Sequence, residues 1–198
     1  MRIAMFGGSF NPVHNGHIQL AGAFVQKLKL DKVLMVPTYL PPHKMTNSQV
    51  SPEDRLMMCR LACENLDFVE VSDIEIKRQG ASYTYLTLQE LSERYQNQEL
   101  FLITGADMFL TIHQWKHPEI IFQLACICGV PRNQDDISSL EKQAEYLKTL
   151  GAKTEILDTG VMTVSSTQIR NAVKQKEDIS NLVPKKVEEY IFRKKLYQ

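Results

Sequence analysis

The sequence predicts an α/β protein built on a doubly wound, mostly parallel sheet. Short apolar runs alternate with amphipathic stretches along the whole chain, and this alternation is typical of strand–helix–strand units. The runs are mostly continuously apolar, as in strands that helices cover on both faces. Turn residues follow several runs, at the edge where such sheets bind ligands. A chain of 198 residues has the usual size of one domain, which we expect to span residues 1–198.

Six of the runs predict strands. They cover residues 2–6, 32–36, 68–76, 100–103, 125–130 and 154–157. The third run alternates apolar and polar side chains and is interrupted at Asp73, so one or two strands are expected there.

The stretches between the runs predict helices, from apolar helical spacing or from capping residues. Ser51 is an N-cap candidate, Pro52 suits the first helical position, and Gly151 ends a later helix. The predicted helices cover residues 18–30, 52–65, 82–95, 138–150, 167–173 and 185–195, with further helices after residues 107 and 115.

Charge and composition limit the classes of partner that the protein is expected to bind. Lysine plus arginine, 23, balances aspartate plus glutamate, 23, so no overall field attracts nucleic acid or an anionic membrane, and phosphate recognition must be local. The N-terminus runs directly into a strand, and no apolar stretch reaches 18 residues, which predicts a soluble, cytoplasmic protein. We expect free, buried thiols at the four cysteines, Cys59, Cys63, Cys126 and Cys128.

The most informative stretch is residues 7–17, Gly-Gly-Ser-Phe-Asn-Pro-Val-His-Asn-Gly-His, between the first apolar run and the first amphipathic stretch. A strand that ends in glycines and opens a helix brings backbone N–H groups to one point, which favours a phosphate. His14 and His17 can donate to phosphoryl oxygens, as neutral imidazole or as imidazolium. The alternative is a glycine turn with incidental histidines or a zinc pair, although catalytic zinc needs a third ligand.

A second stretch, Ser165-Ser166-Thr167-Gln168-Ile169-Arg170, predicts another phosphate-binding helix start. Ser165 or Ser166 can cap a helix, and Arg170 lies one turn further on with a planar fork that suits phosphate. By itself this pattern is also that of a common serine cap with a surface arginine.

Together the two stretches resemble the signatures of the nucleotidyltransferase superfamily, His-x-Gly-His and Ser-Ser-Thr-x-x-Arg. The resemblance implies the superfamily's Rossmann-like fold and transfer of AMP or CMP from a nucleoside triphosphate, with Mg²⁺ held mainly through ATP and no protein metal ligands. Asn11 departs from the aspartate of many relatives, which leaves an acidic role there in doubt. The implied catalytic residues are His14, His17 and Arg170, and the implied ATP-binding residues are Gly7, Gly8, Ser9, Phe10, Gly16, Gly105, Ser165, Ser166 and Thr167.

The residues between the signatures resemble the bacterial nicotinate mononucleotide adenylyltransferase family. The resemblance rests on Pro-Pro-His-Lys at 41–44, Ser-Tyr-Thr at 82–84, Gly-Ala-Asp at 105–107, and a tryptophan ahead of a helix. It implies ATP and nicotinate mononucleotide as substrates. The implied mononucleotide contacts are Trp115 on the pyridine ring, Thr84 on its carboxylate, Lys44 and Arg132 on phosphates, and Asp107 on a ribose hydroxyl.

Alternatives remain open at this stage. Phosphopantetheine adenylyltransferase shares both signatures but leaves Trp115 and residues 41–44 unexplained, and a non-catalytic nucleotide-binding regulator has no need of both histidines. Trp115 can be a packing residue, Thr84 a helix cap and Lys44 an exposed loop cation. The sequence leaves open the preference between acid and amide mononucleotide and the oligomeric state.

Overall fold

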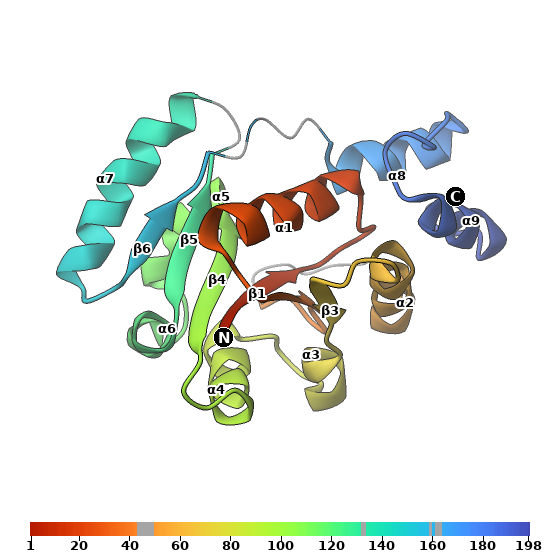
Figure 1. Cartoon of the computed structure of the whole chain (residues 1–198). Helices are drawn as coiled ribbons and strands as arrows, with labels where there is room; N and C mark the ends of the chain where they lie inside the picture. The colour runs from red at the N-terminus through yellow and green to blue at the C-terminus, as the bar shows by residue number, and fades with distance from the viewer. Residues whose placement is uncertain (43–49, 132–133, 159, 161–163) are drawn as a thin grey trace.

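A computed structural model describes residues 1–42, 50–131, 134–158, 160 and 164–198. Its centre is a parallel sheet of six strands in the order β3-β2-β1-β4-β5-β6 (Figure 1). The strands are β1 (Arg2–Gly8), β2 (Lys32–Pro37), β3 (Val69–Val71), β4 (Glu99–Gly105), β5 (Cys126–Val130) and β6 (Thr154–Ile156). The chain moves outward from β1 in one direction and, after β3, returns to place β4 on the other side of β1. The predicted doubly wound α/β class is therefore confirmed.

Helices cover both faces of this sheet, and each face has its own core. Alternate residues of β1 separate the two cores, with Ala4 and Phe6 in one and Ile3 and Met5 in the other. Helices α1, α2, α8 and α9 pack in the first core, and α4, α5, α6 and α7 in the second. The helices are α1 (Asn15–Leu28), α2 (Pro52–Cys63), α3 (Ile74–Arg78), α4 (Thr84–Arg94), α5 (Ala106–Thr111), α6 (Pro118–Leu124), α7 (Asp135–Thr149), α8 (Ser166–Gln175) and α9 (Lys185–Arg193), with a 3-10 turn η1 (Ile112–Gln114).

The run at 68–76 contains one strand, and its second half is helical. Ile74 and Ile76 predicted a strand by their alternation, but both lie in α3. The buried side chain between them is the polar one: Glu75 is 2% exposed and accepts a hydrogen bond of 2.7 Å from the Thr87 hydroxyl. A helix also brings Arg78 to the same face, 3.9 Å from the Glu75 carboxylate. This buried polar cluster overrides the alternation.

Two smaller predictions can also be compared with the structure. The Ser51 hydroxyl accepts from the Asp54 N–H at 3.0 Å and caps α2, as predicted. All four cysteines are free, and Cys126 is only partly buried, whereas the other three are buried as expected. Among the described residues, no helix is both long enough and apolar enough to span a bilayer.

Close packing between β5 and α5 explains a glycine in the sheet. A Cβ on Gly129 would lie 2.8 Å from the ring of Phe109, which is fully buried. That ring fills the space of the missing side chain and seats α5 on the end of β4.

We therefore expect Gly129→Ala to lower the free energy of unfolding by about 1–3 kcal/mol, because neither the strand nor the buried ring can move freely. Gly22→Ala is the matched control, since its Cβ would meet only the Phe68 ring at 3.8 Å and alanine favours a helix. Urea denaturation measures both. Equal stability of the two variants would contradict the packing argument.

Candidate active site

The order of the strands reverses between β1 and β4, and the candidate site lies beyond their carboxyl ends. The loop after β1, residues 9–14, is called the signature loop below. It leads directly into α1, and the loop after β4 leads directly into α5. Two helix N-termini therefore flank the point of reversal.

Phe10 gives the signature loop its shape. Its backbone is left-handed, with φ 45°, a conformation that is rare for an aromatic residue. Its side chain is 2% exposed and packs edge-on against Phe6, with 5.5 Å between ring centroids. A Cβ on Gly8 would lie 3.1 Å from the Phe10 ring, so the loop needs glycine there. The Phe10 ring is buried under the loop, so only the backbone of Phe10 is available for its predicted contact with ATP.

The two histidines of the first signature stack on each other at the start of α1. Their ring centroids are 3.6 Å apart and their planes 31° apart. His14 is the N-cap residue, and its backbone N–H donates to Nδ1 of His17 at 3.2 Å. A ring nitrogen that accepts a hydrogen bond carries no proton, so His17 is the Nε2–H tautomer.

Burial keeps both imidazoles neutral. It lowers the pKa of His14 from 6.5 to about 4. Burial, and to a lesser extent the neighbouring His14, hold the pKa of His17 well below 6.5. Of the two donor forms that the sequence allowed, the structure therefore holds the neutral one. His14 Nδ1 is buried and has no hydrogen-bond partner among the described residues. In the described part of the chain, no group of three histidine, cysteine or acidic side chains could hold a metal.

The second signature contacts the first directly. Ser165 caps α8 by accepting from the Gln168 N–H at 3.2 Å. The neighbouring Ser166 hydroxyl donates instead to the Pro12 carbonyl at 2.9 Å. Arg170 donates to the Asn11 carbonyl at 2.8 Å and to the Thr167 hydroxyl at 3.0 Å. The Arg170 guanidinium is thus bonded to the signature loop, and its predicted role toward phosphate stays a prediction.

Arg55, which the sequence did not single out, joins the signature loop to the loop after β2. The side chain comes from α2 and is 5% exposed. It donates to the carbonyls of Ser9 at 2.7 Å, Thr38 at 2.5 Å and Tyr39 at 3.2 Å. Ser9 and Thr38 both line the cavity described next, so Arg55 sets the spacing of two of its walls. The only signal in the sequence was a cation among the apolar side chains that form the buried face of α2.

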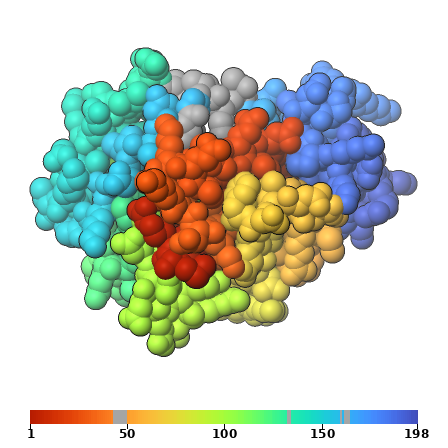
Figure 2. Space-filling view, in the orientation of Figure 1, coloured from red at the N-terminus to blue at the C-terminus, as the bar shows by residue number. Residues whose placement is uncertain are grey.

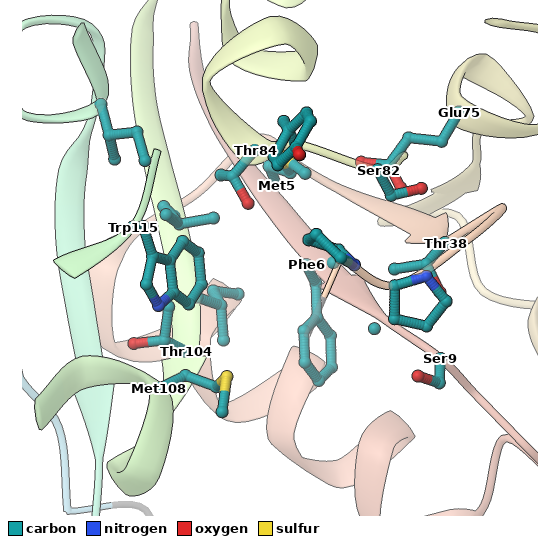
Figure 3. A pocket seen from close by; sticks show the side chains of 18 of the residues that line it. Met5, Phe6, Ser9, Thr38, Glu75, Ser82, Thr84, Thr104, Met108 and Trp115 are labelled. Atoms are coloured by element: carbon teal, nitrogen blue, oxygen red, sulfur yellow. The ribbon is translucent and has the colours of Figure 1, made fainter. Parts of the chain in front are cut away.

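A cavity of about 380 Å³ opens beside the signature loop. Figure 3 shows Trp115 and Met108 on one side and Phe6, Ser9 and Thr38 on the other, with the Thr84 hydroxyl directed between them. Trp115 packs against the second core and is only partly buried. The cavity brings together seven residues predicted from the sequence: Gly7, Gly8, Ser9, Thr84, Gly105, Asp107 and Trp115.

The predicted residues Thr84, Asp107 and Gly105 line this cavity from α4, α5 and the end of β4. Thr84 is the first residue of α4, whose N-cap is Tyr83 and has no side-chain cap bond, so the helix-cap alternative for Thr84 is wrong. Asp107 lies exposed in the first turn of α5. A Cβ on Gly105 would meet no protein atom within 4 Å. Glu75 and Ser82 also line the cavity and were missed, because their buried contacts join segments distant in the sequence.

The remaining predicted residues do not line the cavity. His14, His17, Phe10 and the buried Gly16 belong to the signature loop and the first turn of α1. Ser165, Ser166, Thr167 and Arg170 lie at the start of α8. The two groups touch through the bonds of Ser166 and Arg170 to the loop. Lys44 and Arg132 fall outside the described residues.

Comparison with known proteins gives the family. The sequence profile of the family described as cytidylyltransferase-like matches residues 5–172. A probable nicotinate-nucleotide adenylyltransferase of Clostridium novyi is 36% identical over 195 residues, which cover 98% of each chain. Another probable nicotinate-nucleotide adenylyltransferase, from Fusobacterium nucleatum, is 41% identical over 192 residues, covering 96% of this chain and 97% of the relative.

The fold is also that of a solved structure, the Plasmodium falciparum nicotinic acid mononucleotide adenylyltransferase complexed with NaAD. The TM-score is 0.80 at 19% identity, over 99% of this chain and 97% of that chain. The full-length similarity to the bacterial relatives agrees with the two signatures and the cavity between β1 and β4. The chain therefore belongs to the cytidylyltransferase-like family and, within it, to the nicotinate-nucleotide adenylyltransferases.

Proposed function

We propose that this protein transfers the adenylyl group of ATP to nicotinate mononucleotide, giving nicotinate adenine dinucleotide and pyrophosphate for NAD biosynthesis. Besides membership of the family, one structural observation supports the proposal. A cavity with a tryptophan wall adjoins a glycine loop with two neutral imidazoles, at the point where the strand order reverses. Such a site can hold an aromatic ring and a triphosphate side by side.

The cavity is the proposed mononucleotide half of the site. Trp115 offers a flat face for the pyridine ring, and α4 begins at Thr84 on the same cavity wall. The first N–H groups of a helix have no intrahelical partners and favour a carboxylate. Thr84 and these N–H groups would bind the ring carboxylate, and Asp107 a ribose hydroxyl. Lys44 and Arg132 remain proposed phosphate contacts from the sequence alone.

The signature loop and the start of α8 are the proposed ATP half. The backbone of Gly7, Gly8, Ser9 and Phe10 would follow the triphosphate, with Gly16 and Gly105 allowing close approach. His17 Nε2–H and His14 would donate to phosphoryl oxygens, and Arg170 would complete the contact from α8. The N-terminus of α8, with Ser165, Ser166 and Thr167, adds its own N–H groups.

The proposed reaction is an in-line attack by the mononucleotide phosphate on the α-phosphate of ATP. The attacking group is already an anion, so no general base and no covalent intermediate are required. Catalysis then depends on positioning and on stabilising the charge that develops around phosphorus. We propose that Mg²⁺ is held mainly through ATP oxygens. When bound there, Mg²⁺ would neutralise part of the triphosphate charge.

Trp115 on the cavity wall favours nicotinate mononucleotide over phosphopantetheine, which has no aromatic ring to stack. The decisive experiment measures pyrophosphate release with ATP, Mg²⁺ and one acceptor at a time: nicotinate mononucleotide, nicotinamide mononucleotide or phosphopantetheine. We expect turnover with nicotinate mononucleotide. Binding without turnover would support a regulator, and turnover with phosphopantetheine would overturn the substrate. A cytoplasmic location without nucleic-acid or membrane partners remains a prediction from composition.

If Trp115 stacks on the pyridine ring, Trp115→Ala should raise the KM for the mononucleotide at least about fivefold, since such stacking is worth roughly 1–3 kcal/mol. The KM for ATP should hardly change. Trp115→Phe, which keeps an aromatic face, is the control and should lose less. Because the sequence has one tryptophan, its fluorescence should also change as the mononucleotide binds. An equal effect on both substrates would return Trp115 to a packing role.

His17→Ala should lower kcat by about two to three orders of magnitude, the usual effect of losing one donor to developing charge. ATP affinity, measured by calorimetry, should weaken much less. His17→Gln places an amide N–H near the position of Nε2 and should recover part of the rate. A near-wild-type kcat in the alanine variant would contradict the proposed donor.

Acidification should destabilise the protein because His14 is held neutral in the folded state. Its pKa is about 4 when folded against an ordinary 6.5. Between these two pH values the unfolded chain binds a proton at His14 and the folded chain does not. The free energy of unfolding is therefore highest above pH 6.5 and falls as the pH is lowered to about 4. Urea denaturation of wild type and His14→Asn at pH 7 and pH 4.5 tests this. The wild type should lose on the order of 2–3 kcal/mol more than the variant; parallel losses would refute it.

A further inference from the structure

The C-terminal segment, residues 181–198, forms hydrogen bonds to the signature loop and to the start of α1 in addition to those made by the second signature. Asn15, at the start of α1, donates from its backbone to the Leu182 carbonyl at 2.9 Å and from its side chain to the Asn181 carbonyl at 3.0 Å. Figure 2 shows this segment, in blue, lying against the red-orange surface of α1. The last such contact comes from the end of the chain, where the Tyr197 hydroxyl donates to Oδ1 of Asn11 at 2.6 Å.

Tyr197 is held firmly in place. The chain turns back after α9, where the Leu196 N–H donates to the Ile191 carbonyl at 3.0 Å. Tyr197 itself has a left-handed backbone, with φ 65°, which is unusual for a bulky residue. Its side chain is 8% exposed and belongs to the first core. Burial raises the pKa of the phenol, although Arg170 and Arg55 nearby oppose the shift, so the hydroxyl keeps its proton and acts as the donor.

Asn11 is the point where two C-terminal elements meet the loop. Arg170 holds its backbone carbonyl and Tyr197 holds its side-chain oxygen. Both bonds fix the same residue, two positions after the Ser9 that lines the cavity and three before His14. The cytidylyltransferase-like profile matches residues 5–172, so Tyr197 lies beyond its end.

We propose that Tyr197 is a positioning residue for adenylyl transfer, which holds the signature loop in its ATP-binding shape through the side chain of Asn11. The proposal rests on the proposed function, because it assigns the loop to ATP. Tyr197 touches no reacting atom in this scheme and acts only through Asn11. Its loss should therefore affect ATP and leave the mononucleotide cavity unchanged.

Tyr197→Phe removes the hydroxyl and keeps the ring in the core. One net hydrogen bond corresponds to about a two- to tenfold change in an equilibrium constant, so we expect kcat/KM for ATP to fall by about that factor. The KM for the mononucleotide should stay constant. Tyr190→Phe is the matched control: its hydroxyl donates to Asp54 Oδ1 at 2.8 Å, from the same C-terminal segment to α2 but not to the loop.

The two variants should show similar small losses in thermal stability and differ in kinetics. If Tyr190→Phe lowers kcat/KM for ATP as much as Tyr197→Phe, the effect is one of stability and the proposal is overturned. A constant kcat/KM for ATP in Tyr197→Phe also overturns it. The same hydroxyl loss in an Asn11→Ala background should have no further effect, because the acceptor is gone; additive losses would exclude action through Asn11.

Calorimetric titration with ATP separates this inference from the proposed function. If the wild type binds ATP but forms no dinucleotide, the proposed function fails, and weaker ATP binding by Tyr197→Phe than by Tyr190→Phe still supports the positioning role. A wild-type chain that neither binds ATP nor turns over overturns both.

Discussion

The signature loop depends on hydrogen-bond donors from distant parts of the chain. A loop that presents its N–H groups to a phosphate needs other partners for its carbonyls, since a polar group left unpaired inside a protein is costly. Arg55 of α2 donates to Ser9, and Arg170 and Ser166 of α8 donate to Asn11 and Pro12. The loop therefore takes its shape only after both helices have packed on the first core, and that face of the sheet and the proposed ATP site form together.

A buried positive charge, that of Arg55, lies against this loop. Arg55 is buried and forms no ion pair with a carboxylate among the described residues, so its hydrogen bonds go to backbone carbonyls. The charges of Glu53 and Glu75 act on it from a greater distance. A guanidinium stays protonated even when burial lowers its pKa, as it does here. Because the whole chain carries no net charge, the proposed ATP site would depend on local cations such as Arg55 to attract a triphosphate.

The sequence predicted the fold class, the six strands and seven of the residues that line the cavity, because these follow from local patterns. Apolar runs, glycines after strands and serine caps act over a few residues. The features that the sequence did not predict depend on packing between separate elements. Glu75 is buried because Thr87 and Arg78 surround it, and this turned a predicted strand into α3. Arg55 and Tyr197 bind loop atoms far away along the chain, which no local period reports.

The two halves of the proposed site depend on different interactions, aromatic packing in the cavity and charge at the signature loop. This difference explains why the histidines can be neutral. The cavity offers a preformed aromatic wall and needs little charge. In the ATP half, positive charge comes from arginines fixed to the loop backbone, so the imidazoles need not carry it. A neutral N–H is buried at lower cost than an imidazolium, and its bond to a phosphoryl oxygen strengthens as charge develops there. In the proposed scheme, His17, stacked on His14 and fixed in one tautomer, would bind the transition state more strongly than the ground state.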